Sequence, residues 1–270
     1  MASKYIRMPD PQTGYRHEKC YANDDNNCST KLSREHFISE RYLRQIAVNH
    51  TNKIASLAWQ ELQTFSILPT KGLASRILCS RHNSALSSLD SEFGSFAETI
   101  RDFDRGITSA SVTRTVSGCI IELWMLKCFL GLSVSKNIGG ALKPECVNIL
   151  FERQMWPTEW GLYYCTDAQG GPIYHTDSLA VETLTAPDGR LLGGKFVVQG
   201  LPFYLVLGKP GNPRAFGIWH PREIIFKFPT VEKRISLTWD GQGGSQSVLL
   251  TRTGTYDGPP PIWKDWEKKG

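Results

Sequence analysis

Three cysteines and one histidine constrain this chain more than any other feature, because together they have the composition of a structural zinc site. Cys20 and Cys28 flank a polar, turn-rich segment, and Cys79 and His82 form a compact Cys-x-x-His pair further along. Zinc prefers four nitrogen or sulfur ligands, and its charge readily displaces thiol protons. We predict that these four residues bind one structural zinc ion. His17, in the tighter spacing His17-x-x-Cys20, is a rival ligand, and the competing interpretation is a set of unrelated buried thiols.

Composition places the chain among folded globular proteins. Of its 270 residues, 40% are hydrophobic and 21% are charged, enough apolar side chains for a sizeable core. The most apolar run, residues 119–132, carries Glu122 and Lys127 and is shorter than the roughly 18 residues of a membrane-spanning helix. We therefore expect no membrane association. The net charge of +5 is compatible with nucleic acid but does not require it.

The chain has seven cysteines, and an odd number does not suggest a complete disulfide framework. The first residues lack the apolar run of a secretory signal, so we expect a cytoplasmic protein with reduced thiols. In that compartment clustered cysteines bind metal or do chemistry more often than they form bridges. Four others lie in apolar or strand-like contexts and are expected in the core: Cys119, Cys128, Cys146 and Cys165.

The succession of helix-like and strand-like hydrophobic patterns along the chain predicts an α+β fold with several parts. These are a zinc-binding domain over residues 1–106, a helical bridge over 107–144, an all-β domain over 145–257 and a Pro/Trp tail over 258–270. In the first part we expect a short helix after Ser39, a strand pair within 54–67, and a helix on which apolar residues recur at helical spacing (Leu86, Leu89, Phe93 and Phe96). In the bridge we expect a helix capped by Ser109 or Ser111, with Val112 and Val116 on its apolar face and stops at Gly131 or 139–140.

Short β runs separated by turn residues follow, at the spacing typical of an antiparallel β-sandwich or open barrel. The expected strands are 146–151, 161–165, 178–184, 194–199, 203–207, 215–219, 223–228, 234–239 and 246–251. Alternating apolar residues such as Phe196 and Val198 indicate ordinary core packing. His175 and His220 lie in separate loops, and we assign no site to them.

Two segments between and around the zinc ligands carry a family resemblance. Residues 32–39, LSREHFIS, place Glu35 directly before His36, and this resembles the (Asp/Glu)-His-Ile-x-Pro element of HNH nucleases. Residues 78–83, LCSRHN, resemble that family's Leu-Cys-x-x-Cys-(His/Asn) element, with His82 in place of the second cysteine. The resemblance covers roughly residues 17–95, about a third of the chain. It implies a zinc-stabilised ββα unit of the treble-clef type.

The resemblance also implies a site for phosphodiester hydrolysis. By position, His36 would be the general base for water, while Glu35 and Asn83 would hold a catalytic Mg or Mn ion on the scissile phosphate. Arg34 and Arg81 could contact flanking phosphates or be solvated surface residues. Asp90 could add a metal ligand or lie on a solvated helix face.

Departures from the family pattern leave more than one function open. The family's central Asn, which orients the histidine, would fall near Ala74 and Ser75, so Asn49 or Asn52 would have to replace it; Ser39 also stands where proline is common. The first hypothesis is an HNH-like endonuclease acting on nucleic acid, DNA foremost. The second is a non-catalytic zinc-binding interaction protein whose β domain binds a protein or a small ligand. A purely structural β protein with accidental cysteines is the third.

Overall fold

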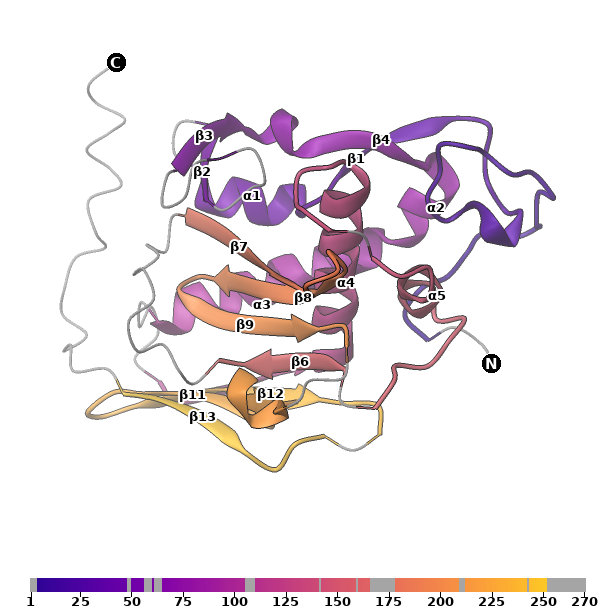
Figure 1. Ribbon diagram of the computed structural model, residues 1–270. Helices are drawn as coiled ribbons and strands as arrows, with labels where there is room; N and C mark the ends of the chain where they lie inside the picture. Colours follow the sequence, from indigo (N-terminus) through magenta and orange to yellow (C-terminus); the bar gives the residue numbers. More distant parts are fainter. Residues whose placement is uncertain are drawn as a thin grey trace, which may run out of the picture.

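The computed structural model describes residues 4–47, 50–55, 60, 65–104, 110–140, 142–158, 160–165, 178–208, 212–241 and 243–251. They form a mixed α+β structure with three sheets (Figure 1). The expected Pro/Trp tail, Ser109, Asn49 and His175 lie outside the described residues. Within the described part, no helix is both long and apolar enough to span a bilayer.

A two-stranded antiparallel sheet pairs β1 (Leu32–His36) with β4 (Ala74–Cys79), and helix α2 (Ser80–Ala85) follows β4 directly. The chain between these strands forms α1 (Glu40–Ile46), β2 (Thr51–Ala55), β3 (Phe65–Pro69) and a 3-10 turn, η2 (Thr70–Leu73). The short helix and the strand pair expected here are both confirmed. A further 3-10 turn, η1 (Asn23–Asp25), lies between Cys20 and Cys28.

The largest sheet has seven strands in the order β10-β6-β9-β8-β7-β2-β3. Its remaining members are β6 (Gly161–Tyr164), β7 (Ser178–Thr185), β8 (Leu191–Val198), β9 (Leu201–Val206) and β10 (Ile218–Trp219). The pair β2–β7 is parallel and the others are antiparallel. This sheet joins strands from both sides of the expected domain boundaries at 106 and 144.

A four-stranded sheet, in the order β13-β11-β12-β5, completes the β structure. Its strands are β5 (Val112–Ser117), β11 (Glu223–Lys227), β12 (Glu232–Thr238) and β13 (Ser247–Thr251). Two of its three pairings, β11–β13 and β12–β5, are parallel, so the sheet is mixed and not purely antiparallel as expected. A 3-10 turn, η3 (Pro213–Phe216), occupies the first two residues of the expected strand 215–219, and only Ile218–Trp219 form a strand.

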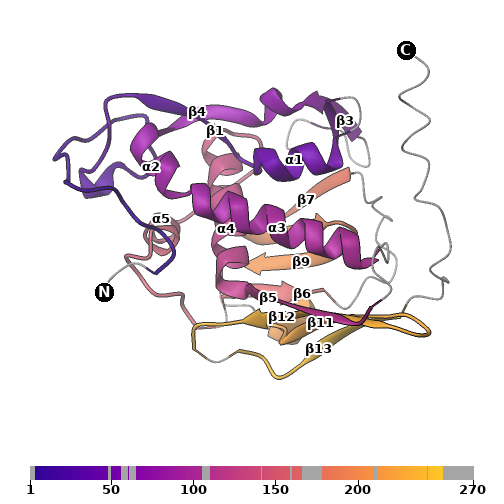
Figure 2. The same cartoon turned by 180° about the vertical axis from the view of Figure 1, so that it is seen from behind.

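Two helices cover one face of the large sheet, as the reverse view shows (Figure 2). They are α3 (Ser87–Asp104) and α4 (Gly118–Val134). The expected apolar face of α3 is confirmed, and Phe93 stacks on Trp124 of α4 at a centroid distance of 3.3 Å. Phe196 of β8 meets Trp124 and Phe129, so these rings form the centre of the core. The four cysteines expected in the core are all buried.

Two expectations about element type are wrong. Residues 112–117 form strand β5, and the bridge helix begins only at Gly118, with the Ser117 hydroxyl accepting the Ile120 N–H at 3.4 Å. Gly131 does not stop it, because α4 continues to Val134. Residues 146–151 were expected as a strand, but helix α5 (Glu145–Leu150) forms instead, since Cys146, Ile149 and Leu150 share a helical face that is buried.

Candidate metal centre

The four predicted zinc ligands converge in one buried group. Cys20 and Cys28 come from the loop around η1, Cys79 is the last residue of β4, and His82 lies in the first turn of α2. Their ligand atoms all lie within 4.8 Å of one another, and every one of these residues is buried. The His82 Nδ1 atom is 3.1 Å from Cys79 Sγ, 3.5 Å from Cys20 Sγ and 3.7 Å from Cys28 Sγ.

These distances match what a tetrahedral zinc ion requires. Bonds of about 2.3 Å to sulfur and about 2.0 Å to nitrogen place a ligand nitrogen about 3.6 Å from each ligand sulfur. The three Nδ1–Sγ distances around His82 scatter about that value. Three soft thiolates and one imidazole are also the donor types that zinc prefers. The group could therefore hold a metal ion such as zinc.

The strand-to-helix junction explains how Cys79 is prepared to bind a cation. Cys79 caps α2, and its Sγ accepts the backbone N–H groups of His82 and Ser29 at 3.5 and 3.4 Å. Burial acts to raise the pKa of the Cys79 thiol, but these N–H groups outweigh it and lower the pKa to about 6. Burial raises the pKa of Cys20 and Cys28 above the ordinary thiol value. Metal binding would therefore have to displace protons from those two thiols.

His17, the predicted rival, is not part of the group. Its carbonyl accepts the Cys20 N–H at 2.9 Å and so closes the turn that carries Cys20. Its Nδ1 accepts the Lys19 N–H at 3.2 Å. The spacing His17-x-x-Cys20 thus reflects a backbone turn and not a pair of ligands.

Asp25 contacts the Cys3His group, and the sequence reasoning did not single it out. Its Oδ2 lies 3.1 Å from His82 Nε2 and 2.5 Å from Arg153 Nη2. A carboxylate on the outer nitrogen of a ligating histidine fixes the tautomer that leaves Nδ1 free to bind metal. The only signal in the sequence is that Asp25 belongs to the polar loop between Cys20 and Cys28.

Asp25→Asn is expected to weaken zinc binding about 10- to 100-fold, because the amide replaces the carboxylate that orients His82. Competition with a zinc chelator of known affinity measures the change. Asp24→Asn is the matched control, since Asp24 pairs with the exposed Arg16 and lies outside the Cys3His group. Equal zinc affinity in the two variants would contradict the role of Asp25.

The predicted catalytic residue Glu35 points into the protein and pairs with Lys127. Its Oε1 lies 2.6 Å from Lys127 Nζ, and the two side chains are only 4% and 1% exposed. The same ammonium contacts both carboxylate oxygens of Asp90, at 2.9 and 2.8 Å, and the His36 carbonyl at 3.3 Å. Burial disfavours the charged ammonium, but Glu35 and Asp90 outweigh it and raise the pKa of Lys127. We call this arrangement the Lys127 cluster.

His36 and Asn83 each contact a residue other than Glu35. The His36 side chain is 22% exposed, and its Nδ1 lies 4.0 Å from the Glu40 carboxylate. Partial burial lowers the pKa of the His36 imidazole, and Glu40 opposes that effect. The Asn83 amide donates to the Ser33 hydroxyl at 2.8 Å. A carboxylate paired with a buried ammonium is a poor ligand for Mg or Mn, so Glu35 does not suit the predicted catalytic ion.

Of the residues considered for the missing central Asn, those that the structure describes do not orient His36. Ala74 and Ser75 pair with His36 and Glu35 across the β1–β4 sheet, but neither carries an amide. Asn52 is buried and donates to the Thr70 hydroxyl at 3.0 Å.

The two arginines predicted near phosphates bind backbone carbonyls. Arg34 donates to the Lys71 carbonyl at 2.7 Å, and Arg81 donates to the carbonyls of Pro9 and Pro11.

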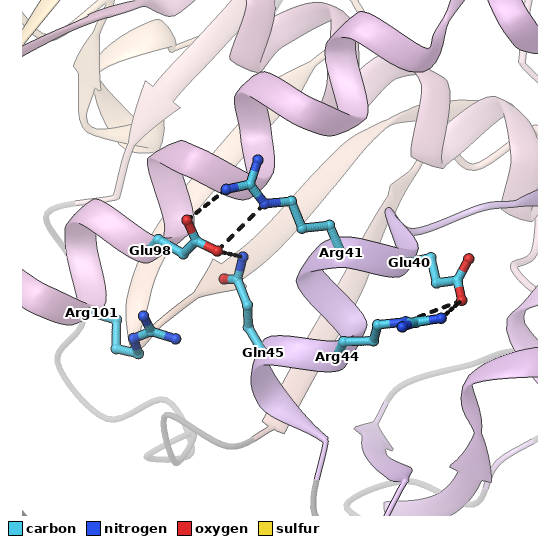
Figure 3. Close-up of a pocket in the computed structure, with 6 residues that line it drawn as sticks. All are labelled: Glu40, Arg41, Arg44, Gln45, Glu98 and Arg101. Carbon is cyan, nitrogen blue, oxygen red and sulfur yellow. Dashed lines mark hydrogen bonds and ion pairs between the residues drawn. The ribbon is translucent and has the colours of Figure 1, made fainter.

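A polar groove of about 640 Å³ lies between α1 and α3 (Figure 3), and Glu40 in its lining lies 4.0 Å from His36 Nδ1. Arg41 pairs with Glu98 at 2.7 Å, and Arg44 pairs with Glu40 at 2.6 Å. Arg101 completes the lining on the α3 side. Three arginines against two glutamates leave a weak positive excess, which is less than the basic stripe that nucleic-acid proteins usually present.

Comparison of the chain with protein-family models, curated proteins and solved structures gives no match.

Proposed function

We propose that this chain is a zinc-structured binding protein, built on an HNH-like ββα unit, that acts without hydrolysing nucleic acid. The antiparallel β1–β4 pair followed by α2 supports the ββα unit, because the Cys3His group joins the β4–α2 junction to the loop that precedes β1. The ion would bind Cys20, Cys28, Cys79 and His82 and supply cross-linking only. The free state of all seven cysteines fits a reducing compartment such as the cytoplasm.

The Lys127 cluster is the observation that carries this proposal. A catalytic ion on Glu35 would have to displace an ammonium that already meets Glu35, Asp90 and a carbonyl. Removing one partner from such a buried pair costs about 3–5 kcal/mol, because the other charge stays buried. We infer that the Lys127 ammonium occupies the place beside Glu35 that a metal ion would need. Glu35 therefore stabilises the core and does not act on a phosphate.

An endonuclease is the second candidate, and a specific arrangement favours it. His36 is partly exposed at the end of β1, and it lies beside Glu40, which lines the arginine-containing groove of Figure 3. A phosphate backbone in this groove would approach an imidazole that is able to accept a proton near neutral pH.

A cleavage assay separates the two candidates. Incubated with supercoiled plasmid or single-stranded DNA and either Mg²⁺ or Mn²⁺, the zinc-loaded full chain is expected to leave both substrates intact. His36→Ala is expected to behave identically. Metal-dependent nicking by the wild type that is lost in His36→Ala would overturn the proposal and establish the endonuclease. Zinc analysis of both preparations is the control for folding.

A further inference from the structure

A cavity of about 420 Å³ lies outside the Cys3His group. It is enclosed by the N-terminal segment, the start of α4, the chain between α5 and β6, and the end of β10. Four aromatic side chains line it: Tyr5, Trp156, Trp160 and Trp219. Cavities of this size with aromatic walls and a few fixed polar groups are typical of small-ligand sites.

Glu122 gives this cavity a buried carboxylate in a fixed position. The residue is only 2% exposed, and its Oε1 accepts the Leu162 N–H at 2.7 Å and lies 2.5 Å from His220 Nε2. The His220 ring is stacked between Trp219 and Trp239, at centroid distances of 4.0 and 3.9 Å. The histidine, and through it Glu122, is thus held rigidly.

The backbone is also adapted to this pair. Gly161 has a φ of +123°, and a Cβ at this position would come within 2.3 Å of Glu122 Oε1 and 2.9 Å of His220 Nε2. Only glycine therefore allows β6 to approach the Glu122–His220 pair this closely.

The charges around the cavity favour a cation. Its lining holds three carboxylates, from Glu122, Glu152 and Asp240, against Lys4 and His220. Carboxylates therefore outnumber cations in either protonation state of the histidine. Asp240 pairs with Lys4, and Glu152 accepts backbone N–H groups of the N-terminal segment. Among the described residues Glu122 Oε2 has no hydrogen-bond partner, so this atom could accept an N–H from a ligand.

We propose that this cavity binds an organic ammonium ion that retains at least one N–H. The ammonium group bonds to Glu122, and the carbon framework packs against Trp156 and Trp219, whose faces attract cations. This deepens the binding function proposed above by naming its ligand class. The inference rests on the cavity alone, so cleavage of DNA would refute the proposed function and leave this site standing.

Calorimetric titration of the zinc-loaded full chain with four matched probes tests the ligand class. Benzylammonium is expected to bind at least about tenfold more tightly than benzyl alcohol, which lacks the charge. It is also expected to bind more tightly than benzyltrimethylammonium, which lacks an N–H. Benzoate is expected not to bind. Absence of benzylammonium binding, or equal or tighter binding of any other probe, would overturn the proposal.

Variants test the residues. Glu122→Gln is expected to weaken benzylammonium binding at least about tenfold, and Trp156→Leu about threefold. Glu98→Gln, in the groove of Figure 3, is the matched control and is expected to leave binding unchanged. If Glu122→Gln does not fold, Trp156→Leu tests the assignment instead. Trp156 is only partly buried, so its replacement is expected to leave the fold intact. Unchanged affinity in folded Glu122→Gln or in Trp156→Leu would overturn the assignment.

Discussion

Cys79→Ser is expected to remove the bound zinc and to unfold the part of the chain that it cross-links. Cys79 both supplies one of the four ligands and caps α2, so its loss affects the metal and the helix that carries His82. Structural zinc in small domains contributes on the order of 10 kcal/mol, which is comparable to the whole stability of a domain. We expect a fall in melting temperature of more than about 10 °C, measured by thermal unfolding, together with the loss of stoichiometric zinc.

A second buried cysteine provides the control for this experiment. Cys146 on α5 is as buried as Cys79 but lies outside the Cys3His group. Cys146→Ser is expected to keep one zinc ion per chain, with only the modest loss of stability that a polar atom in the core causes. A Cys79→Ser protein that retained its zinc would show that the ligands had been misassigned.

The four members of the Cys3His group were predictable from the sequence because their chemistry is specific. Three thiols and an imidazole are a typical ligand set for zinc. In addition, the sequence around Cys79-x-x-His82 predicts a strand that leads into a helix. The choice between Cys28 and His17 needed the fold, since the backbone turn at His17 is invisible in the spacing. Asp25 was missed because an acidic residue in a polar loop looks like any solvated side chain.

The orientation of Glu35 could not be predicted in the same way. Successive residues of a strand face opposite sides, but the β1–β4 register shifts between Ser33 and Glu35, so the alternation cannot simply be counted along the strand. Its partner Lys127 lies in the distant helix α4, within an apolar run. The sequence shows that the charged Lys127 interrupts this apolar run. It does not show which carboxylate pairs with the ammonium.

The misassigned elements have an equally physical explanation. Val112 and Val116 are four residues apart, and that spacing places them on one side of a helix and also on one side of a strand. Pairing of β5 with β12 decides in favour of the strand. Similarly, a short apolar run such as 146–151 fits either a buried strand or a buried helix, and packing against α4 selects the helix.

Lys127→Met is expected to lower the free energy of unfolding by about 3–5 kcal/mol. The substitution keeps the length of the side chain but removes the ammonium that compensates Glu35 and Asp90. Burial already raises the pKa of Glu35, and Lys127 opposes this rise. Without Lys127 the carboxyl group must either stay charged without its cation or take up a proton. Denaturant unfolding at neutral pH measures the loss.

Lys143→Met is the matched control, because Lys143 pairs with Glu145 at 3.2 Å on the surface, where both side chains are about one third exposed. Such a pair contributes less than about 1 kcal/mol. Adding Glu35→Gln to Lys127→Met is expected to recover part of the lost stability, because it removes one of the uncompensated charges. If Lys127→Met were no more damaging than Lys143→Met, Glu35 would not depend on the ammonium. The carboxylate before His36 would then be available to a metal ion, and the endonuclease would become the better hypothesis.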